Sequence, residues 1–293
     1  MKTLIILFGA FFIQSTLNSF QQEDEIARLE GNVKEHPGDF DSVRELAQIL
    51  IDQENYDACA DILNSYLSID SVNAEALYLY GRIMDLTDNI PEAMGYYQLS
   101  INHDSTLWKA HRDLAFLYDV FADYENTNRY MIQAIRFSPS PESLYYDLGY
   151  SYDMLEQIDS AFFYYHMALD FNPGDYQASL NIGAIWGNWG QMDSARIYTE
   201  RSLEVNPDSP EVCFNFAEIM AVDGDTAAAI SYFSKTLALA PGVFAAQKRL
   251  GELHEAMGDS AMARIYFEEF LDSVPMIYVD DISEIRAKLD QYK

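Results

Sequence analysis

The chain has 293 residues, of which 49% are hydrophobic, and it carries 47 acidic against 18 basic side chains for a formal net charge of −29. A surface this acidic repels phosphate backbones and anionic lipid headgroups, which argues against nucleic-acid binding and against direct anchoring to a membrane. The composition therefore favours a protein or peptide partner that is neutral or basic.

Residues 1–19 are predicted to be a secretory signal peptide. Lys2 supplies a positive charge, residues 4–13 are an unbroken apolar run, and small and polar residues follow. A run this short cannot cross a bilayer core. Its uniform apolarity also leaves no polar face for a packed N-terminal helix, which is the alternative interpretation. With cleavage near Ser19, residues 20–293 would be exported to the periplasm or secreted, and the short leader favours a bacterial source.

Residues 20–39 are predicted to form an N-terminal capping helix. Ile26, Leu29 and Val33 share one helical face. The stretch from His36 to Asp39 contains a proline and a glycine, which end a helix and prepare the start of the next one. We expect this helix to cover the exposed end of the segment that follows.

Residues 40–277 repeat with a period of 34 residues, seven times and without insertion. Position 8 of each repeat is glycine or alanine, position 20 is small, and position 28 is aliphatic. The residues at position 8 are Ala47, Gly81, Ala115, Gly149, Gly183, Ala217 and Gly251. Small residues at positions 8 and 20 allow two antiparallel helices to approach closely where they cross, and larger apolar residues fill the space around the crossing.

This register resembles that of the tetratricopeptide repeat (TPR) family. The resemblance implies an all-α fold, a right-handed superhelical solenoid of seven helix-turn-helix repeats in residues 40–277. A capping helix precedes the repeats at residues 20–39, and another follows them at residues 278–293. In the last helix, Ile282, Ile285 and Leu289 make a narrow apolar stripe that would dock on the final repeat while the other face stays polar.

Asparagine or aspartate recurs at position 16, in the turn between the two helices of a repeat. Such side chains accept hydrogen bonds from the free N–H groups of the next helix, worth about 1 kcal/mol each. The residues are Asn55, Asn89, Asp123, Asp225 and Asp259.

Two cysteines occur in the sequence, Cys59 and Cys213, at packing positions five repeats apart. Stacked helices at ordinary spacing place them much farther apart than a disulfide allows. We therefore expect both to be free, buried thiols.

The sequence contains no glycine-rich phosphate loop, nucleophile elbow or pair of cysteines at zinc spacing. His111 and His254 occupy helix-packing positions, so we interpret them as core residues and not as ligands. We predict no cofactor, no metal site and no enzymatic activity.

The TPR resemblance implies that the first helix of each repeat lines a concave groove, through positions 2, 5, 6, 9, 12 and 13. The candidate groove residues are Asp85, Asp113, Asp119, Asp147, Asp153, Asn181, Asn215, Arg249, Tyr78, Phe116, Tyr146, Tyr150 and Phe214. The alternative is an ordinary solvated helix face whose aromatic residues lean on the core.

Aspartate recurs at position 12 in repeats two to four and at position 6 in repeats three and four, where asparagine then continues the line. From Asp113 to Arg249 is four repeat steps, about 40 Å, which is room for roughly twelve extended residues. Aspartates would select basic side chains, and asparagine amides would bond a peptide backbone without reading its sequence. Against this, Arg82 and Arg112 could neutralise the aspartates within the protein.

The sequence thus predicts a protein-interaction scaffold of the bacterial envelope that binds an extended, basic or neutral segment of another protein in its groove. The alternative is a structural or assembly subunit of a larger envelope complex, which docks through its convex face or its ends. The sequence names neither the partner nor the oligomeric state.

Overall fold

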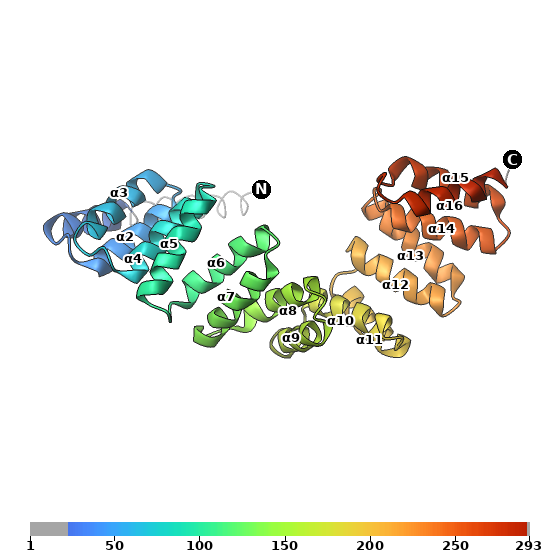
Figure 1. The fold of residues 1–293 in the computed structure, drawn as a ribbon, viewed down its shortest axis with the longest axis horizontal. Helices are drawn as coiled ribbons and strands as arrows, with labels where there is room; N and C mark the ends of the chain where they lie inside the picture. Colours follow the sequence, from blue (N-terminus) through green and yellow to red (C-terminus); the bar gives the residue numbers. More distant parts are fainter. Residues whose placement is uncertain (1–22, 292–293) are drawn as a thin grey trace, which may run out of the picture. The chain divides into compact units, whose positions relative to one another are not determined.

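The computed structural model describes residues 23–291, and the regular secondary structure of this part of the chain is helical. Two helices form each predicted repeat (Figure 1), which confirms the all-α fold of seven helix-turn-helix repeats. The first helices are α2 (Phe40–Asp52), α4 (Ala74–Leu86), α6 (Trp108–Val120), α8 (Tyr145–Met154), α10 (Tyr176–Asn188), α12 (Pro210–Val222) and α14 (Phe244–Ala256). The second helices are α3 (Tyr56–Leu67), α5 (Ile90–His103), α7 (Tyr124–Phe137), α9 (Ile158–Phe171), α11 (Met192–Val205), α13 (Thr226–Leu239) and α15 (Ser260–Ser273).

The chain divides into two compact units, the first ending at Pro141 and the second beginning at Glu142. The division coincides with the boundary between repeats three and four. Pro139 and Pro141 lack backbone N–H groups and so interrupt helical hydrogen bonding. Helix α8 then begins after a single 3₁₀ turn, η1 (Glu142–Leu144). Repeats one to three belong to the first unit and repeats four to seven to the second.

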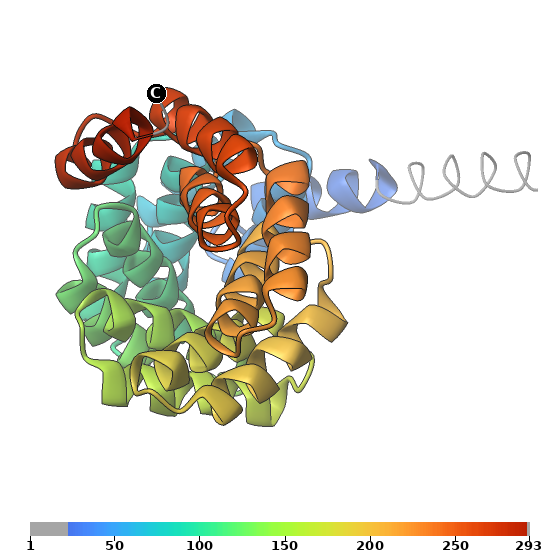
Figure 2. The ribbon, with the colours of Figure 1, turned by 90° about the vertical axis from the view of Figure 1, so that its right-hand side faces the viewer.

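Within each unit, the two helices of a repeat pack on each other, and the second helix packs on the first helix of the next repeat (Figure 2). The close approach at position 8 explains this pairing. A Cβ atom added to Gly149 would lie 2.8 Å from a ring carbon of Tyr165, and one added to Gly251 would lie 2.5 Å from a ring carbon of Phe267. The rings belong to position 24 of the same repeats, so the aromatic ring of the second helix lies directly against the glycine of the first.

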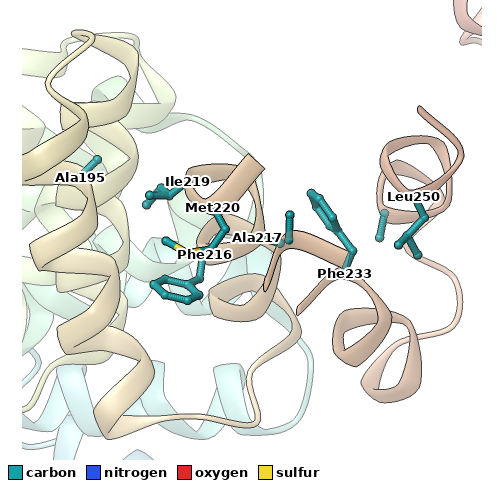
Figure 3. Close-up of a cluster of buried hydrophobic side chains, with 9 residues drawn as sticks. Ala195, Phe216, Ala217, Ile219, Met220, Phe233 and Leu250 are labelled. Carbon is teal, nitrogen blue, oxygen red and sulfur yellow. The ribbon is translucent and has the colours of Figure 1, made fainter. Parts of the chain in front are cut away.

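The same packing continues in repeat six, where the small residue is an alanine. Figure 3 shows the ring of Phe233 beside Ala217, and all its atoms are buried. Leu250, from the first helix of the next repeat, belongs to the same cluster. A core built this way is continuous from one repeat to the next. The ring packs against the first helix of its own repeat, and it shares a cluster with a residue from the first helix of the following repeat.

Every turn between the two helices of a repeat contains one residue with a left-handed backbone, always at position 15. These residues are Glu54, Asp88, Ala122, Glu156, Gly190, Gly224 and Gly258. The next N–H closes the first helix by bonding a carbonyl five residues earlier, as Asn55 does with Leu50 at 2.8 Å. This is the Schellman arrangement, which favours glycine at the left-handed residue.

The predicted caps at position 16 are confirmed for aspartate and wrong for asparagine. The carboxylates of Asp123, Asp225 and Asp259 accept from backbone N–H groups three residues later. Asn55 and Asn89 make no such bond. The side-chain amide of Asn89 instead donates to the carbonyl and hydroxyl oxygens of Thr87, which turns it away from the next helix.

Helical residues lie at both ends of the repeats. Residues 23–35 are helical, and Leu29 on this helix is 1% exposed. After the repeats, α16 (Val279–Asp290) buries Ile282 and Ile285 in a cluster with Phe267 and Phe270. The predicted signal peptide, residues 1–19, lies outside the described residues. In the described part of the chain, no helix combines the length and apolarity that crossing a bilayer requires.

Both cysteines are buried and unpaired, as predicted. Burial raises the pKa of the Cys59 thiol to about 11, with the positive charge of Arg82 opposing the shift. A thiol with so high a pKa is almost wholly protonated at neutral pH and is a poor nucleophile.

The contact between Gly149 and Tyr165 predicts the effect of a substitution. Gly149→Leu should lower the free energy of unfolding by about 1–3 kcal/mol, because the new side chain overpacks the helix crossing. Gly95→Leu is the matched control, since Gly95 is exposed in the middle of α5 with no atom within 4 Å of an added Cβ. The control should leave the stability unchanged or raise it by up to about 1 kcal/mol. Urea unfolding measures both, and equal effects of the two changes would contradict the proposed crossing.

Candidate functional site

The candidate residues lie on the first helices, on α4 and α6 in the first unit and on α8, α10, α12 and α14 in the second. We call the surface formed by positions 5, 6, 9, 12 and 13 of these helices the first-helix wall. The predicted line from Asp113 to Arg249 includes residues of both units, so each unit carries its own part of the wall.

Two of the three aspartates at position 12 are bonded within their own repeat. The hydroxyl of Tyr97 donates to Asp85 at 3.2 Å, and that of Tyr165 donates to Asp153 at 3.4 Å. Both tyrosine rings are fully buried, and a buried tyrosine hydroxyl needs a partner. Burial raises the pKa of both carboxyls, and the tyrosine hydrogen bonds partly oppose the rise. These aspartates therefore serve the core as well as the wall.

Asp113, at position 6 of α6, is also bonded inside the protein. The hydroxyl of Tyr78 donates to it at 2.9 Å, and Arg112 forms an ion pair with it at 2.6 Å. The side chain of Asp113 is only 13% exposed. Tyr78 is 3% exposed, so it is a packing residue and cannot anchor a partner. Arg112 therefore neutralises the charge of Asp113 within the protein, as the sequence had suggested it could.

The second unit repeats this bond with an amide in place of the carboxylate. Asn181, at position 6 of α10, makes side-chain hydrogen bonds with Tyr146 of the preceding repeat and with Tyr165. Burial raises the pKa of Tyr146 to about 12, and the bond from Asn181 opposes the rise. Asn181 thus links repeat five to repeat four, as Asp113 links repeat three to repeat two.

Asp119 differs from the other aspartates at position 12. Position 24 of its repeat is Met131, which offers no hydroxyl group, and no side chain of the described residues pairs with the carboxylate. Burial alone raises its pKa. Phe116 lies three residues earlier on the same helical face and is 38% exposed. The pair presents an apolar ring beside an unpaired, partly desolvated carboxylate.

The wall of α8 has a similar arrangement. Tyr150 is 38% exposed at position 9, three residues before Asp153, as Phe116 is before Asp119. Asp147, at position 6, is half-buried. Aromatic rings and carboxylates therefore alternate on the first-helix wall in repeats three and four.

On α14 the wall carries basic side chains, which form ion pairs with carboxylates of the protein itself. Arg249 binds Glu218 through two nitrogens, at 2.7 and 3.0 Å, and binds Glu252 at 2.6 Å. Lys248 is paired with Asp281 of α16 at 2.6 Å. Arg249, a candidate groove residue, is thus held by carboxylates of its own chain.

Phe214 packs inward, with its ring 5.4 Å from that of Phe233. Like Tyr78, it contributes to the core more than to the surface of the wall.

Beside Asn215, a hollow of about 280 Å³ opens between α10, α11 and α12. Gly183 and Gly187 line it from α10, Thr199 from α11, and Asn215 and Glu218 from α12. Ala195 and Ile219, both labelled in Figure 3, also border it. Of these residues, only Asn215 is among the candidate groove residues predicted from the sequence. The available signal was that repeat five has Gly187 at position 12 and Thr199 at position 24, where repeats two and four have aspartate and tyrosine.

In the described part of the chain, no three histidine, cysteine, aspartate or glutamate side chains gather where they could hold a metal ion. His111 is buried, and one of its ring nitrogens lies 3.0 Å from the carbonyl oxygen of Ser105. Burial lowers its pKa, so the ring is neutral at physiological pH.

The unpaired carboxylate of Asp119 predicts a dependence on pH. Because its pKa is raised in the folded protein, the folded state loses stability as the pH rises from about 3.9, the value of an unfolded aspartate, through the folded pKa. Asp119→Asn should therefore stabilise the protein at pH 7, by about 0.5 kcal/mol, and the gain should shrink toward pH 4.5. Urea unfolding across this range measures it. Asp61→Asn, at an exposed site on α3, is the control. A loss of stability at pH 7 would show that Asp119 has a bonding partner in the fold.

The comparisons with known proteins agree with this architecture. Residues 214–275 match the family model of the tetratricopeptide repeat. No curated protein sequence is significantly similar to the chain. Among solved structures, the chain is similar to YrrB, a TPR protein with an unusual peptide-binding site, at 20% identity and a TM-score of 0.57, over 64% of this chain and 96% of YrrB.

Two further structures cover more of the chain. One is pilF of Pseudomonas aeruginosa, at 15% identity and a TM-score of 0.61, over 74% of this chain and 97% of pilF. The other is PilW, a widely conserved type IV pilus biogenesis factor, at 18% identity and a TM-score of 0.58, over 72% of this chain and 97% of PilW. Taken with the family match over residues 214–275 and the seven-fold register, these similarities show that the chain has a tetratricopeptide repeat fold.

Proposed function

We propose that the protein is a non-enzymatic scaffold that binds an extended segment of another protein on its first-helix wall. The observation that carries the proposal is the pairing of exposed rings with carboxylates at positions 9 and 12, Phe116 with Asp119 and Tyr150 with Asp153. Exposed aromatic side chains anchor partners, and a desolvated charge discriminates among them. The similarity to YrrB, a structure known for a peptide-binding site, supports the same function.

The partner segment is basic or neutral. Asp119 carries a charge that no described side chain neutralises, and the whole chain has a formal charge of −29. Such a field speeds the approach of basic segments and repels acidic ones. Asp85, Asp147 and Asp153 add to the negative potential of the wall, whereas Asp113 contributes less because Arg112 is paired with it.

The scaffold acts in the bacterial envelope after export. The support is the predicted signal peptide in residues 1–19, together with the fold shared with pilF and with PilW, a type IV pilus biogenesis factor. The partner would accordingly be an exported or envelope protein.

A second candidate function has a specific observation in its favour. The loop between α15 and α16 and the first residue of α16 expose four apolar residues in succession, with Met276 at 78% and Ile277 at 83%, followed by Tyr278 and Val279. Exposed apolar residues in a contiguous stretch are typical of a protein interface. Through this loop the protein would serve as a structural or assembly subunit of a larger envelope complex.

The test of groove binding removes charge and keeps shape. In the triple variant Asp85→Asn, Asp119→Asn, Asp153→Asn, the amide oxygens can still accept from Tyr97 and Tyr165, so the fold should be retained. A partner captured on the parent protein from the native envelope fraction should bind this variant at least tenfold more weakly at low salt. The difference should shrink at high salt, because salt screens the charge.

The control is a second triple variant, Asp61→Asn, Glu200→Gln, Glu269→Gln. These three carboxylates are exposed on second helices, and the variant removes the same amount of charge. It should bind nearly as the parent does. Equal loss in both variants would indicate a diffuse effect of net charge. No loss in either would leave the wall as a solvated helix face and would favour docking through the loop at Met276.

Export predicts a processed N-terminus. Protein isolated from its native source should begin near Phe20, and intact-mass spectrometry would detect the removal of residues 1–19. Recovery of the chain with Met1 in the cytosolic fraction would refute export, without bearing on the groove.

A further inference from the structure

The repeats differ in what fills the space between their two helices at positions 8, 12 and 24. In repeat two the ring of Tyr97 lies against Gly81, where an added Cβ would meet it at 2.7 Å, and its hydroxyl bonds Asp85. Repeat four places Tyr165 in the same way between glycine and aspartate. The chain itself therefore shows that a phenol ring fits this space.

Repeat five keeps the space but lacks the ring. Gly183 stands at position 8, Thr199 at position 24 and Gly187 at position 12. A Cβ on Gly183 would meet the hydroxyl oxygen of Thr199 at 2.7 Å, so the threonine fills only the part of the space nearest the glycine. A Cβ on Gly187 would meet the Cβ of Ala195 at 3.9 Å, an ordinary van der Waals contact, so a side chain here fits without a clash. The hollow of about 280 Å³ lies here, and all three residues line it.

The hollow is large enough for an aromatic side chain and is open to solvent. A cavity of about 150 Å³ already accepts benzene. Ala184, Asn188 and Val222 border the hollow and are exposed, so a side chain can enter from the first-helix wall. Apolar contact comes from Ala195 and Ile219.

The polar groups in the hollow favour a neutral hydroxyl over a cation. Asn215 offers an amide that both donates and accepts, and Glu218 offers carboxylate oxygens with spare acceptor capacity. The charge of Glu218 is already engaged by the bidentate contact of Arg249, at 2.7 and 3.0 Å. A lysine or arginine entering the hollow would meet this guanidinium as well as the carboxylate, whereas a phenol hydroxyl can donate to an oxygen without opposition.

We propose that the hollow in repeat five is a pocket for one aromatic side chain of the partner segment, with tyrosine as the preferred residue. The partner's ring takes the place that Tyr97 and Tyr165 occupy in their own repeats. The proposal rests on the proposed function, because it names the side chain that the first-helix wall of the second unit would receive.

The first experiment tests the pocket without any partner. The side-chain analogue p-cresol is titrated into the purified protein, and backbone amide shifts are followed by NMR. Shifts should centre on Gly183, Ala184 and Gly187. Thr199→Tyr fills the hollow from inside, as in repeats two and four, and should weaken p-cresol binding at least tenfold while the melting temperature is kept.

Gly187→Leu is a second filling variant, since Gly187 lines the hollow and a Cβ there makes only an ordinary contact at 3.9 Å, and it should have the same effect. Gly95→Leu, at an exposed position of α5, is the matched control and should bind p-cresol as the parent does. Binding that both filling variants retain would overturn the proposal. Tighter binding of n-butylamine than of p-cresol would also overturn it, by showing a site for cations.

The second experiment selects binders from a display library of random twelve-residue segments. If the selected segments share an aromatic residue and lose binding to Thr199→Tyr, the proposal is supported. If they share none and bind Thr199→Tyr equally well, the proposed function stands and the aromatic pocket is refuted. If p-cresol occupies the hollow but no segment is selected, the pocket stands and segment binding by the wall fails.

Discussion

The structure depends on the contact between a small residue on the first helix of each repeat and a larger side chain on the second. At Gly149 and Gly251 the contact is so close that a single added carbon would overlap an aromatic ring. This approach sets the distance between the helices, and the distance in turn decides which side chains of the wall reach inward. In repeats two and four the buried ring carries its hydroxyl to the aspartate at position 12, so core packing and the chemistry of the wall are linked through one tyrosine.

The sequence predicted the fold because small residues at fixed spacing have a single good explanation, the crossing of two helices. It also predicted the three aspartate caps. The candidate site was harder to predict. A residue's position on the first helix fixes the helix face on which its side chain lies, but it does not fix which side chain of the protein bonds to it. Asp85 and Asp119 both occupy position 12 of their repeats. Tyr97 donates a hydrogen bond to Asp85, whereas Met131, which stands in the place of that tyrosine in repeat three, has no hydroxyl group to donate to Asp119. Comparing position 24 between repeats would have separated them.

Other features of the wall were beyond the sequence for a different reason. Tyr78 and Phe214 stand at positions that the family exposes, but here both rings pack against aromatic residues of the second helices. Arg249 was expected at the end of an amide ladder and is instead held by Glu218 and Glu252. Such choices depend on side-chain conformations that span neighbouring repeats, and the period alone does not reveal them.

The left-handed residue at position 15 has a consequence for the balance of stability along the chain. Repeats five to seven place glycine there, whereas repeats one to four place Glu54, Asp88, Ala122 and Glu156. A side chain in this conformation costs roughly 1–2 kcal/mol, less for aspartate. Because repeats stabilise mainly their neighbours, the cost remains local. The turns of repeats one to four therefore carry a conformational cost that the glycines of repeats five to seven avoid.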